Sequence, residues 1–125
     1  MKKIIIFLLV IITLGFDTQK GEAFAGGEFL KFRVHYGLIN AGYATIEVKD
    51  EKLNNEPVYH VIGKGFSTGM TKFFFNVQDV YESYIDKETR NPYRFVRKIN
   101  EGGYIKNQEG FFNQKTNMIL VKDYK

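Results

Sequence analysis

The chain has 125 residues, with 18 Lys and Arg against 14 Asp and Glu, which gives a net charge of +4. This length admits one domain, and a composition of 44% hydrophobic and 16% aromatic residues excludes a chain that stays disordered for lack of apolar material. The sequence has no cysteine, which excludes a disulfide scaffold, a thiol nucleophile, a Cys-ligated metal site and a diacylglyceryl lipid anchor.

The amino terminus has the pattern of a secretory signal peptide. A short basic start is followed by an apolar stretch over residues 4–14 and by the small-x-small site Ala23-Phe24-Ala25. The apolar stretch is shorter than the roughly 20 residues that a spanning helix needs. Cleavage after Ala25 is therefore favoured over an uncleaved anchor or a buried helix. We expect a signal peptide over residues 1–25 and a single β domain over residues 26–125.

Charges of both signs alternate along the expected domain, as in Lys49-Asp50-Glu51-Lys52 and Asp86-Lys87-Glu88. Proteins that bind nucleic acids instead gather Lys and Arg into a patch or run. The pattern indicates a solvated surface of mixed charge and argues against a nucleic-acid partner.

Three strands are predicted first, because polar and apolar residues alternate with the period of a half-buried strand. They cover Leu30–Tyr36, Ala44–Val48 and Val58–Phe66, and the polar segment from Asp50 to Pro57 is expected to be a loop. Gly63 and Gly65 predict a bulge or a sharp bend within the third strand.

The alternation stops between Ser67 and Phe75, where a Ser or Thr cap predicts one helical turn near residues 68–74. Alternation then returns in four more segments: Val77–Ile85, Tyr93–Ile99, Tyr104–Phe112 and Met118–Tyr124. The prediction is an all-β fold, an antiparallel meander of about seven strands with one short helical turn.

Bulky residues occupy both faces of several predicted strands, for example Phe111 beside Phe112. A flat sheet of this kind would leave a large apolar face in water. We therefore expect the sheet to curl into a half-barrel or open barrel, or to be covered by something else. The last predicted strand also leaves an edge that is open to pairing.

Three spaced motifs carry a family resemblance: YGLINAG at residues 36–42, VQDVYESYID at residues 77–86 and NPYRFVRKINEGGY at residues 91–104. Together they resemble the exported bacterial family labelled domain of unknown function 3108, in a Bacteroidetes-type version, from about residue 27 to residue 125. The resemblance implies a secreted, mostly antiparallel β protein with a fold likened to that of a capsule-operon lipoprotein. Family members are generally longer, so the match implies an amino-terminal part of the family and a chain truncated at its carboxyl end. The resemblance brings no catalytic residues with it.

A structural ion pair is predicted for Asp79. If its side of the strand faces inward, the carboxylate needs a buried partner, and Arg94 or Arg97 on the neighbouring predicted strand could supply it. The alternatives are an exposed ion pair and a polar cluster that binds a ligand.

The residues available for catalysis argue against an enzyme. His35 and His60 lack the spacing that places two imidazoles on one metal ion, and neither Ser67 nor Ser83 lies in a Gly-x-Ser-x-Gly turn. We expect no catalytic residue, no metal and no cofactor.

Phe73, Phe74 and Phe75 form the most apolar triplet of the expected domain. Three consecutive side chains cannot all point inward from one short segment, so at least one should be exposed unless something covers it. The triplet is either part of the core or exposed. If it is exposed, it forms the ligand-binding mouth of an apolar concavity or a contact with a membrane or a partner.

These patterns favour an exported cell-envelope protein, periplasmic or associated with the outer membrane of a Gram-negative bacterium. Its expected role is to bind or carry an apolar or glycan ligand, and the high aromatic content suits that role. The alternatives are a structural or assembly protein that pairs through its open sheet edge, and a truncated fragment of a longer family member. The expected partners are an envelope lipid, a glycan or a protein, with no transmembrane segment after signal cleavage.

Overall fold

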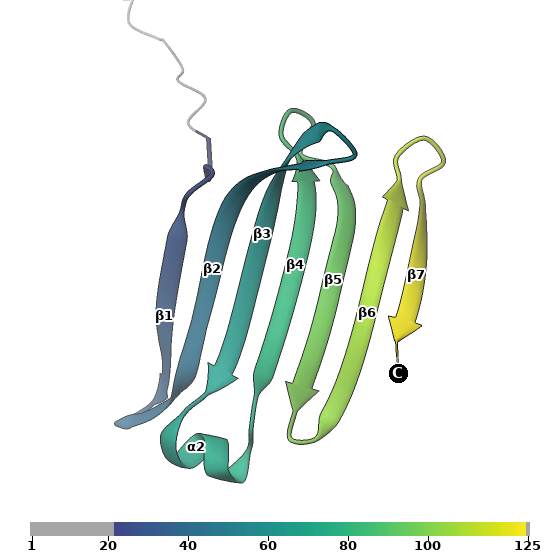
Figure 1. Cartoon of the computed structure of the whole chain (residues 1–125). Helices are drawn as coiled ribbons and strands as arrows, with labels where there is room; N and C mark the ends of the chain where they lie inside the picture. The colour runs from purple at the N-terminus through teal and green to yellow at the C-terminus, as the bar shows by residue number, and fades with distance from the viewer. Residues whose placement is uncertain (1–21, 125) are drawn as a thin grey trace, which may run out of the picture.

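The computed structural model describes residues 22–124, so most of the expected signal peptide lies outside the described residues. Seven strands form one sheet in the order β1 to β7, and each strand is antiparallel to its neighbour in sequence (Figure 1). The expected all-β meander is confirmed. The strands are β1 Phe29–Tyr36, β2 Ile39–Leu53, β3 Glu56–Ser67, β4 Gln78–Asp86, β5 Pro92–Glu101, β6 Tyr104–Asn113 and β7 Met118–Tyr124.

One short helix, α2 at Gly69–Phe74, joins β3 to β4, where a helical turn was expected. Within residues 22–124, no helix is long and apolar enough to span a bilayer.

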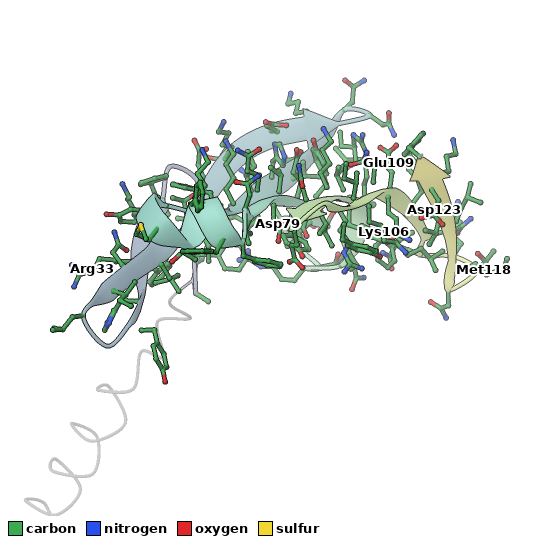
Figure 2. All side chains as sticks on the ribbon, turned by 90° about the horizontal axis from the view of Figure 1, so that it is seen from below. Arg33, Asp79, Lys106, Glu109, Met118 and Asp123 are labelled. Carbon is green, nitrogen blue, oxygen red and sulfur yellow. The ribbon has the colours of Figure 1, made fainter. Side chains whose placement is uncertain are left out.

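The sheet is open, because β1 and β7 are the two ends of the strand order and do not pair with each other. Figure 1 shows the strands as one curled layer, with the β1–β2 turn and α2 at one end and the β2–β3 and β6–β7 hairpins at the other. We call these the α2 end and the hairpin end. Seen from the α2 end, side chains stand on both sides of this layer (Figure 2). This agrees with the expected half-barrel.

The β2–β3 hairpin is longer than the sequence pattern indicated. The segment from Asp50 to Pro57 was expected to be a loop, but β2 continues to Leu53 and β3 starts at Glu56. Asn54 and Asn55 make the turn with φ values of 51° and 68°. Two consecutive residues in the left-handed region are typical of the tight turn whose twist matches that of the strands, so the strands can pair up to the turn.

The bulge expected at Gly63 and Gly65 is absent. Both glycines keep continuous pairing with β2 and with β4, and the register shifts lie instead at Val34/His35 in β1 and at Tyr84/Ile85 in β4. Gly63 pairs with Ile46 and Tyr81, and Gly65 pairs with Ala44 and Asp79, so neither glycine is the unpaired extra residue that defines a bulge.

The register divides the side chains between two faces. On the polar face lie Glu51, His60, Glu82, Arg94 and Glu109, whereas the apolar face carries residues such as Leu30, Ile46, Val61, Phe95 and Val121. Few apolar side chains are buried, and these are Val48, Val58, Tyr59 and Ile99. Much of the apolar face therefore stays in contact with water, as expected for an uncovered sheet.

The segment before β1 covers a small part of the apolar face near the hairpin end. The Phe24 ring meets the Tyr59 ring edge to face, with centroids 5.2 Å apart. The Tyr59 hydroxyl donates to Glu22 Oε2 at 3.1 Å. These contacts help to bury Tyr59.

Candidate functional site

A large cavity lies between the start of β5 and the β6–β7 hairpin. Its volume is about 720 Å³, which is within the usual range for small-ligand sites. We call it the hairpin cleft. Its lining residues are Tyr93, Phe111, Phe112, Asn113, Gln114, Lys115, Thr116, Met118, Ile119 and Leu120.

The cleft exists because the β6–β7 hairpin extends past the ladder that joins β6 to β5. That ladder ends at the pair Arg94 and Phe111, whereas β6 and β7 stay paired up to Asn113 and Met118. The Gln114 side-chain amide donates back to the carbonyl of Pro92 and ties the hairpin to β5.

The turn of this hairpin is held by Asn113, whose Oδ1 accepts the backbone N–H groups of Lys115 at 3.0 Å and Thr116 at 3.2 Å. Such a side-chain turn fixes the local backbone without a long-range contact.

The cleft is mainly aromatic and aliphatic, with cations close to it. The Arg94 guanidinium lies 5.7 Å and the Lys122 ammonium 5.3 Å from the centre of the Phe111 ring. A smaller adjoining cavity of about 340 Å³ is shared with the β2–β3 hairpin through Leu53, Asn54 and Glu56. Aromatic walls with a few polar groups suit an apolar group or the less polar face of a sugar.

A polar network beside the cleft centres on His60. The two ring nitrogens of His60 lie 2.8 Å from Glu51 Oε1 and 2.8 Å from Glu82 Oε2, and only 10% of the His60 side chain is exposed. Both bonds form together only if both nitrogens, or one nitrogen and one carboxyl group, carry a proton. Because Glu51 is on β2 and Glu82 on β4, this contact ties the β2–β3 hairpin to the middle of the sheet.

Tyr84 stacks on the His60 ring with centroids 4.2 Å apart and an interplanar angle of 12°. Burial, with a smaller effect from Glu82, raises the pKa of Tyr84 above its usual value. The stack and the carboxylates thus favour the neutral phenol.

The network continues to the edge of the sheet. Arg94 lies over the Tyr84 ring, 5.2 Å from its centre, and pairs with Glu109. Glu109 also accepts a hydrogen bond from the Tyr124 hydroxyl at 2.8 Å. The bond from Tyr124, together with that from Arg94, lowers the pKa of Glu109. A cavity of about 240 Å³ lies among Glu82, Arg94, Glu109 and Tyr124.

The structure gives Asp79 other partners than the arginines expected for it. Asp79 is 8% exposed on the apolar face, where it accepts the backbone N–H of Asn100 at 3.0 Å. Its hydrogen bond with Glu101 raises the pKa of Glu101. Figure 2 shows Asp79 close to the centre of the sheet, seen past α2.

Neither arginine pairs with Asp79, since no ion pair within 4.0 Å joins them over residues 22–124. Arg94 lies on the opposite face, whereas Arg97 shares the face of Asp79. The Arg97 Nε is buried with no hydrogen-bond partner in this part of the chain.

The phenylalanine triplet is exposed but is not at the cleft. Phe73, Phe74 and Phe75 are 83%, 76% and 51% exposed, and they lie in and just after α2. The β6–β7 hairpin, whose residues line the hairpin cleft, is at the other end of the sheet (Figure 1). Whether the triplet binds a ligand remains a prediction.

The sequence did not identify the hairpin cleft or the His60 network. Phe111 and Phe112 stood out only for their bulk. His60 is 9 residues from Glu51 and 22 from Glu82, and only the sheet register brings these positions together. Among residues 22–124, no group of three His, Asp or Glu side chains is arranged to hold a metal ion.

The fold and the cleft define a class of protein, namely a single-layer, open antiparallel sheet with an apolar cleft at one end. Residues 31–125 match the model of the family described as "Protein of unknown function (DUF3108)", and the chain belongs to this family. Comparisons with curated proteins and with solved structures gave no match.

Proposed function

We propose that the protein is an exported, non-enzymatic cell-envelope module that binds or carries an apolar or glycan ligand in the hairpin cleft. The observation that carries this proposal is the size of the cleft, about 720 Å³, together with its aromatic and aliphatic lining. Such a lining gains free energy by removing apolar ligand surface from water.

A location in the periplasm or at the outer membrane of a Gram-negative bacterium is part of the proposal. Its support is the basic start, the short apolar stretch and the Ala23-Phe24-Ala25 site. Cleavage after Ala25 would also remove the Phe24 ring from Tyr59 and leave more of the apolar face exposed.

Binding rather than catalysis is supported by the charged groups near the cleft, which pair with one another. His60 contacts two carboxylates, and Arg94 is paired with Glu109. Groups that satisfy one another in this way hold the sheet together, whereas a general base must reach the proton that it removes.

A second candidate is an assembly protein that pairs through its sheet edges. All eight residues of β1 and all seven of β7 are exposed, and each strand has a single neighbour within the described sheet. Exposed edges of this kind can add a strand from another chain.

The test is a binding titration of the protein recovered from the extracytoplasmic fraction, whose intact mass should begin at Gly26. The probes are N-phenyl-1-naphthylamine and a panel of neutral oligosaccharides. We expect saturable binding of at least one probe and an affinity about tenfold lower in Met118→Ser, for a methionine side chain partly buried by ligand.

The matched control is Met70→Ser, because Met70 and Met118 are 69% and 67% exposed but only Met118 lines the cleft. Equal affinity of the two variants, or no saturable binding of any probe, contradicts the proposed site. Light scattering on the same samples tests the second candidate, which requires a stable oligomer or complex.

A further inference from the structure

Large apolar side chains project from the α2 end of the sheet. They come from two elements that lie side by side, the β1–β2 turn and α2 (Figure 1), and the Thr68 N–H donates to the Ala41 carbonyl at 3.0 Å between them. We call these side chains the apolar tips. They are Tyr36 (85% exposed), Leu38 (106%), Ile39 (59%), Met70 (69%), Phe73 (83%) and Phe74 (76%).

The apolar tips take almost no part in the packing of the sheet. α2 has no buried residue, and the Phe73 and Phe74 rings contact each other locally, with centroids 5.4 Å apart. Isolated exposed apolar residues are ordinary, but a cluster of this size marks an interaction site.

Basic residues lie on one side of the apolar tips. Lys72 is in α2, which has no acidic residue in its first turn, and Lys31, Arg33 and Lys64 lie on the polar face toward the same end. Figure 2 shows Arg33 beside the β1–β2 turn. On this face the acidic residues lie farther from the α2 end, and they are Glu47, Glu51, Glu56, Glu82, Asp86 and Glu109. Lys49, Arg94 and Lys122 lie among them.

Two carboxyl groups near the α2 end do not cancel this positive charge. Asp79 and Glu101 lie on the apolar face rather than among the basic residues. Asp79 is buried, and the sheet separates both groups from the basic residues of the polar face.

We infer that the α2 end is a membrane-docking surface, which places its apolar tips in the interface of a bilayer that contains anionic lipids. Aromatic and aliphatic side chains are stabilised there, at a depth of about 5–10 Å, and nearby Lys and Arg residues are attracted to the lipid headgroups. The hairpin cleft, at the opposite end, then faces away from the membrane. This inference does not depend on what the cleft binds.

A bilayer fits the apolar tips better than a folded partner protein does. None of the cavities described above includes these residues, so the surface offers projections rather than a pocket. A fluid interface accepts projections without a matching shape, whereas a specific protein interface needs complementary packing.

The chain contains no tryptophan, so a single introduced Trp can report insertion. The experimental variant is Phe73→Trp, and the matched control is Phe29→Trp, because Phe29 is also exposed, at 59%. Phe29 is seven strand residues from Tyr36, about 23 Å, and should remain in water. Vesicles of phosphatidylcholine with 30% phosphatidylglycerol are compared with vesicles of phosphatidylcholine alone.

With the anionic vesicles we expect a blue shift and quenching by brominated acyl chains for Phe73→Trp, and neither for Phe29→Trp. Lys72→Glu should lower the vesicle partition coefficient more than fivefold, since each basic residue near the surface contributes about 1 kcal/mol. Phe73→Ser with Phe74→Ser should lower it at least tenfold while the melting temperature is unchanged.

An unchanged Phe73→Trp emission at millimolar anionic lipid would overturn the inference. A blue shift of both Trp variants would do so as well, because it would mean that another surface or a retained leader binds the vesicles. Recovery of a protein complex that depends on Phe73 and Phe74, without vesicle binding, would assign the surface to a protein partner instead.

Discussion

The carboxyl group of Asp79 interacts with that of Glu101 near the α2 end. This interaction, with the negative charge of Asp79, raises the pKa of Glu101 above its ordinary value of 4.5. The folded protein therefore holds the Glu101 proton more tightly than the unfolded chain does. The resulting stability is fully present below pH 4.5 and is lost as the pH rises through the pKa of the folded state.

The Glu101→Gln variant should therefore be more stable than the wild type at pH 7. Glutamine keeps a hydrogen-bond donor for Asp79 and has no charge to lose. Thermal melts between pH 3 and pH 8 should show a higher melting temperature for the variant at neutral pH and a difference that vanishes below about pH 4. A variant that is less stable at pH 7 would show that the ionised Glu101 is needed.

Asp86 serves as a control, because its pKa is shifted in the opposite direction and its contribution to stability should depend on pH in the opposite way. Hydrogen bonds from the backbone N–H of Thr89 and from the Tyr93 hydroxyl lower its pKa to about 2. The contribution of Asp86 to stability is present above the ordinary aspartate pKa of 3.8 and is lost as the pH falls toward 2. Asp86→Asn should accordingly be less stable than the wild type at pH 7.

At the scale of single elements, the glycines of β2 and β3 differ in what surrounds them. A Cβ on Gly42 would overlap the carbonyl of Phe66, which is backbone on the neighbouring strand, whereas a Cβ on Gly65 would meet nothing within 4 Å. Neither glycine has a positive φ value. Alanine substitutions at the two positions therefore distinguish the effect of a close approach between the strands from the effect of glycine's backbone flexibility.

The Gly42→Ala variant should lose about 2 kcal/mol of unfolding free energy, because the strands can separate only by breaking their ladder. Gly65→Ala should lie within about 0.5 kcal/mol of the wild type or be slightly more stable, since alanine restricts the unfolded chain. Urea denaturation measures both. Equal effects at the two positions would show that β2 and β3 do not approach each other this closely.

At the scale of the whole molecule, each strand packs mainly beside its neighbours in sequence, and the buried core is small. Its apolar members are Val48, Val58, Tyr59 and Ile99, which come from β2, β3 and β5. All residues of β1 and β7 are exposed. Stability should therefore decrease from the centre of the sheet to its edges.

Amide hydrogen exchange should reproduce this gradient. We expect the slowest exchange in β3 and β4, and exchange at least tenfold faster in β1 and β7, because edge strands can open without disrupting the central ladders. Protection of β7 equal to that of β3 would contradict this order and would indicate a further strand paired with that edge.

The alternation of polar and apolar residues was enough to predict seven strands, their order along the chain and the short helix, because a period of two is a local property. It also singled out the phenylalanine triplet, but it left open whether the triplet belongs to the core or is exposed. It was less reliable at Asp50–Pro57, where two asparagines allow a tighter turn than the polar composition indicated, and at Gly63 and Gly65, which stay paired on both sides of β3 instead of forming a bulge.

The contacts between distant residues depend on the tertiary structure. Register determines that His60 meets Glu51 and Glu82, that Arg94 meets Glu109, and that Asp79 meets Asn100 and Glu101. Register follows from turn lengths and from the shifts at Val34/His35 and Tyr84/Ile85, which alternation does not encode. The hairpin cleft likewise arises where β6 and β7 extend beyond their ladder with β5, a mismatch of lengths that exists only once the strands have paired.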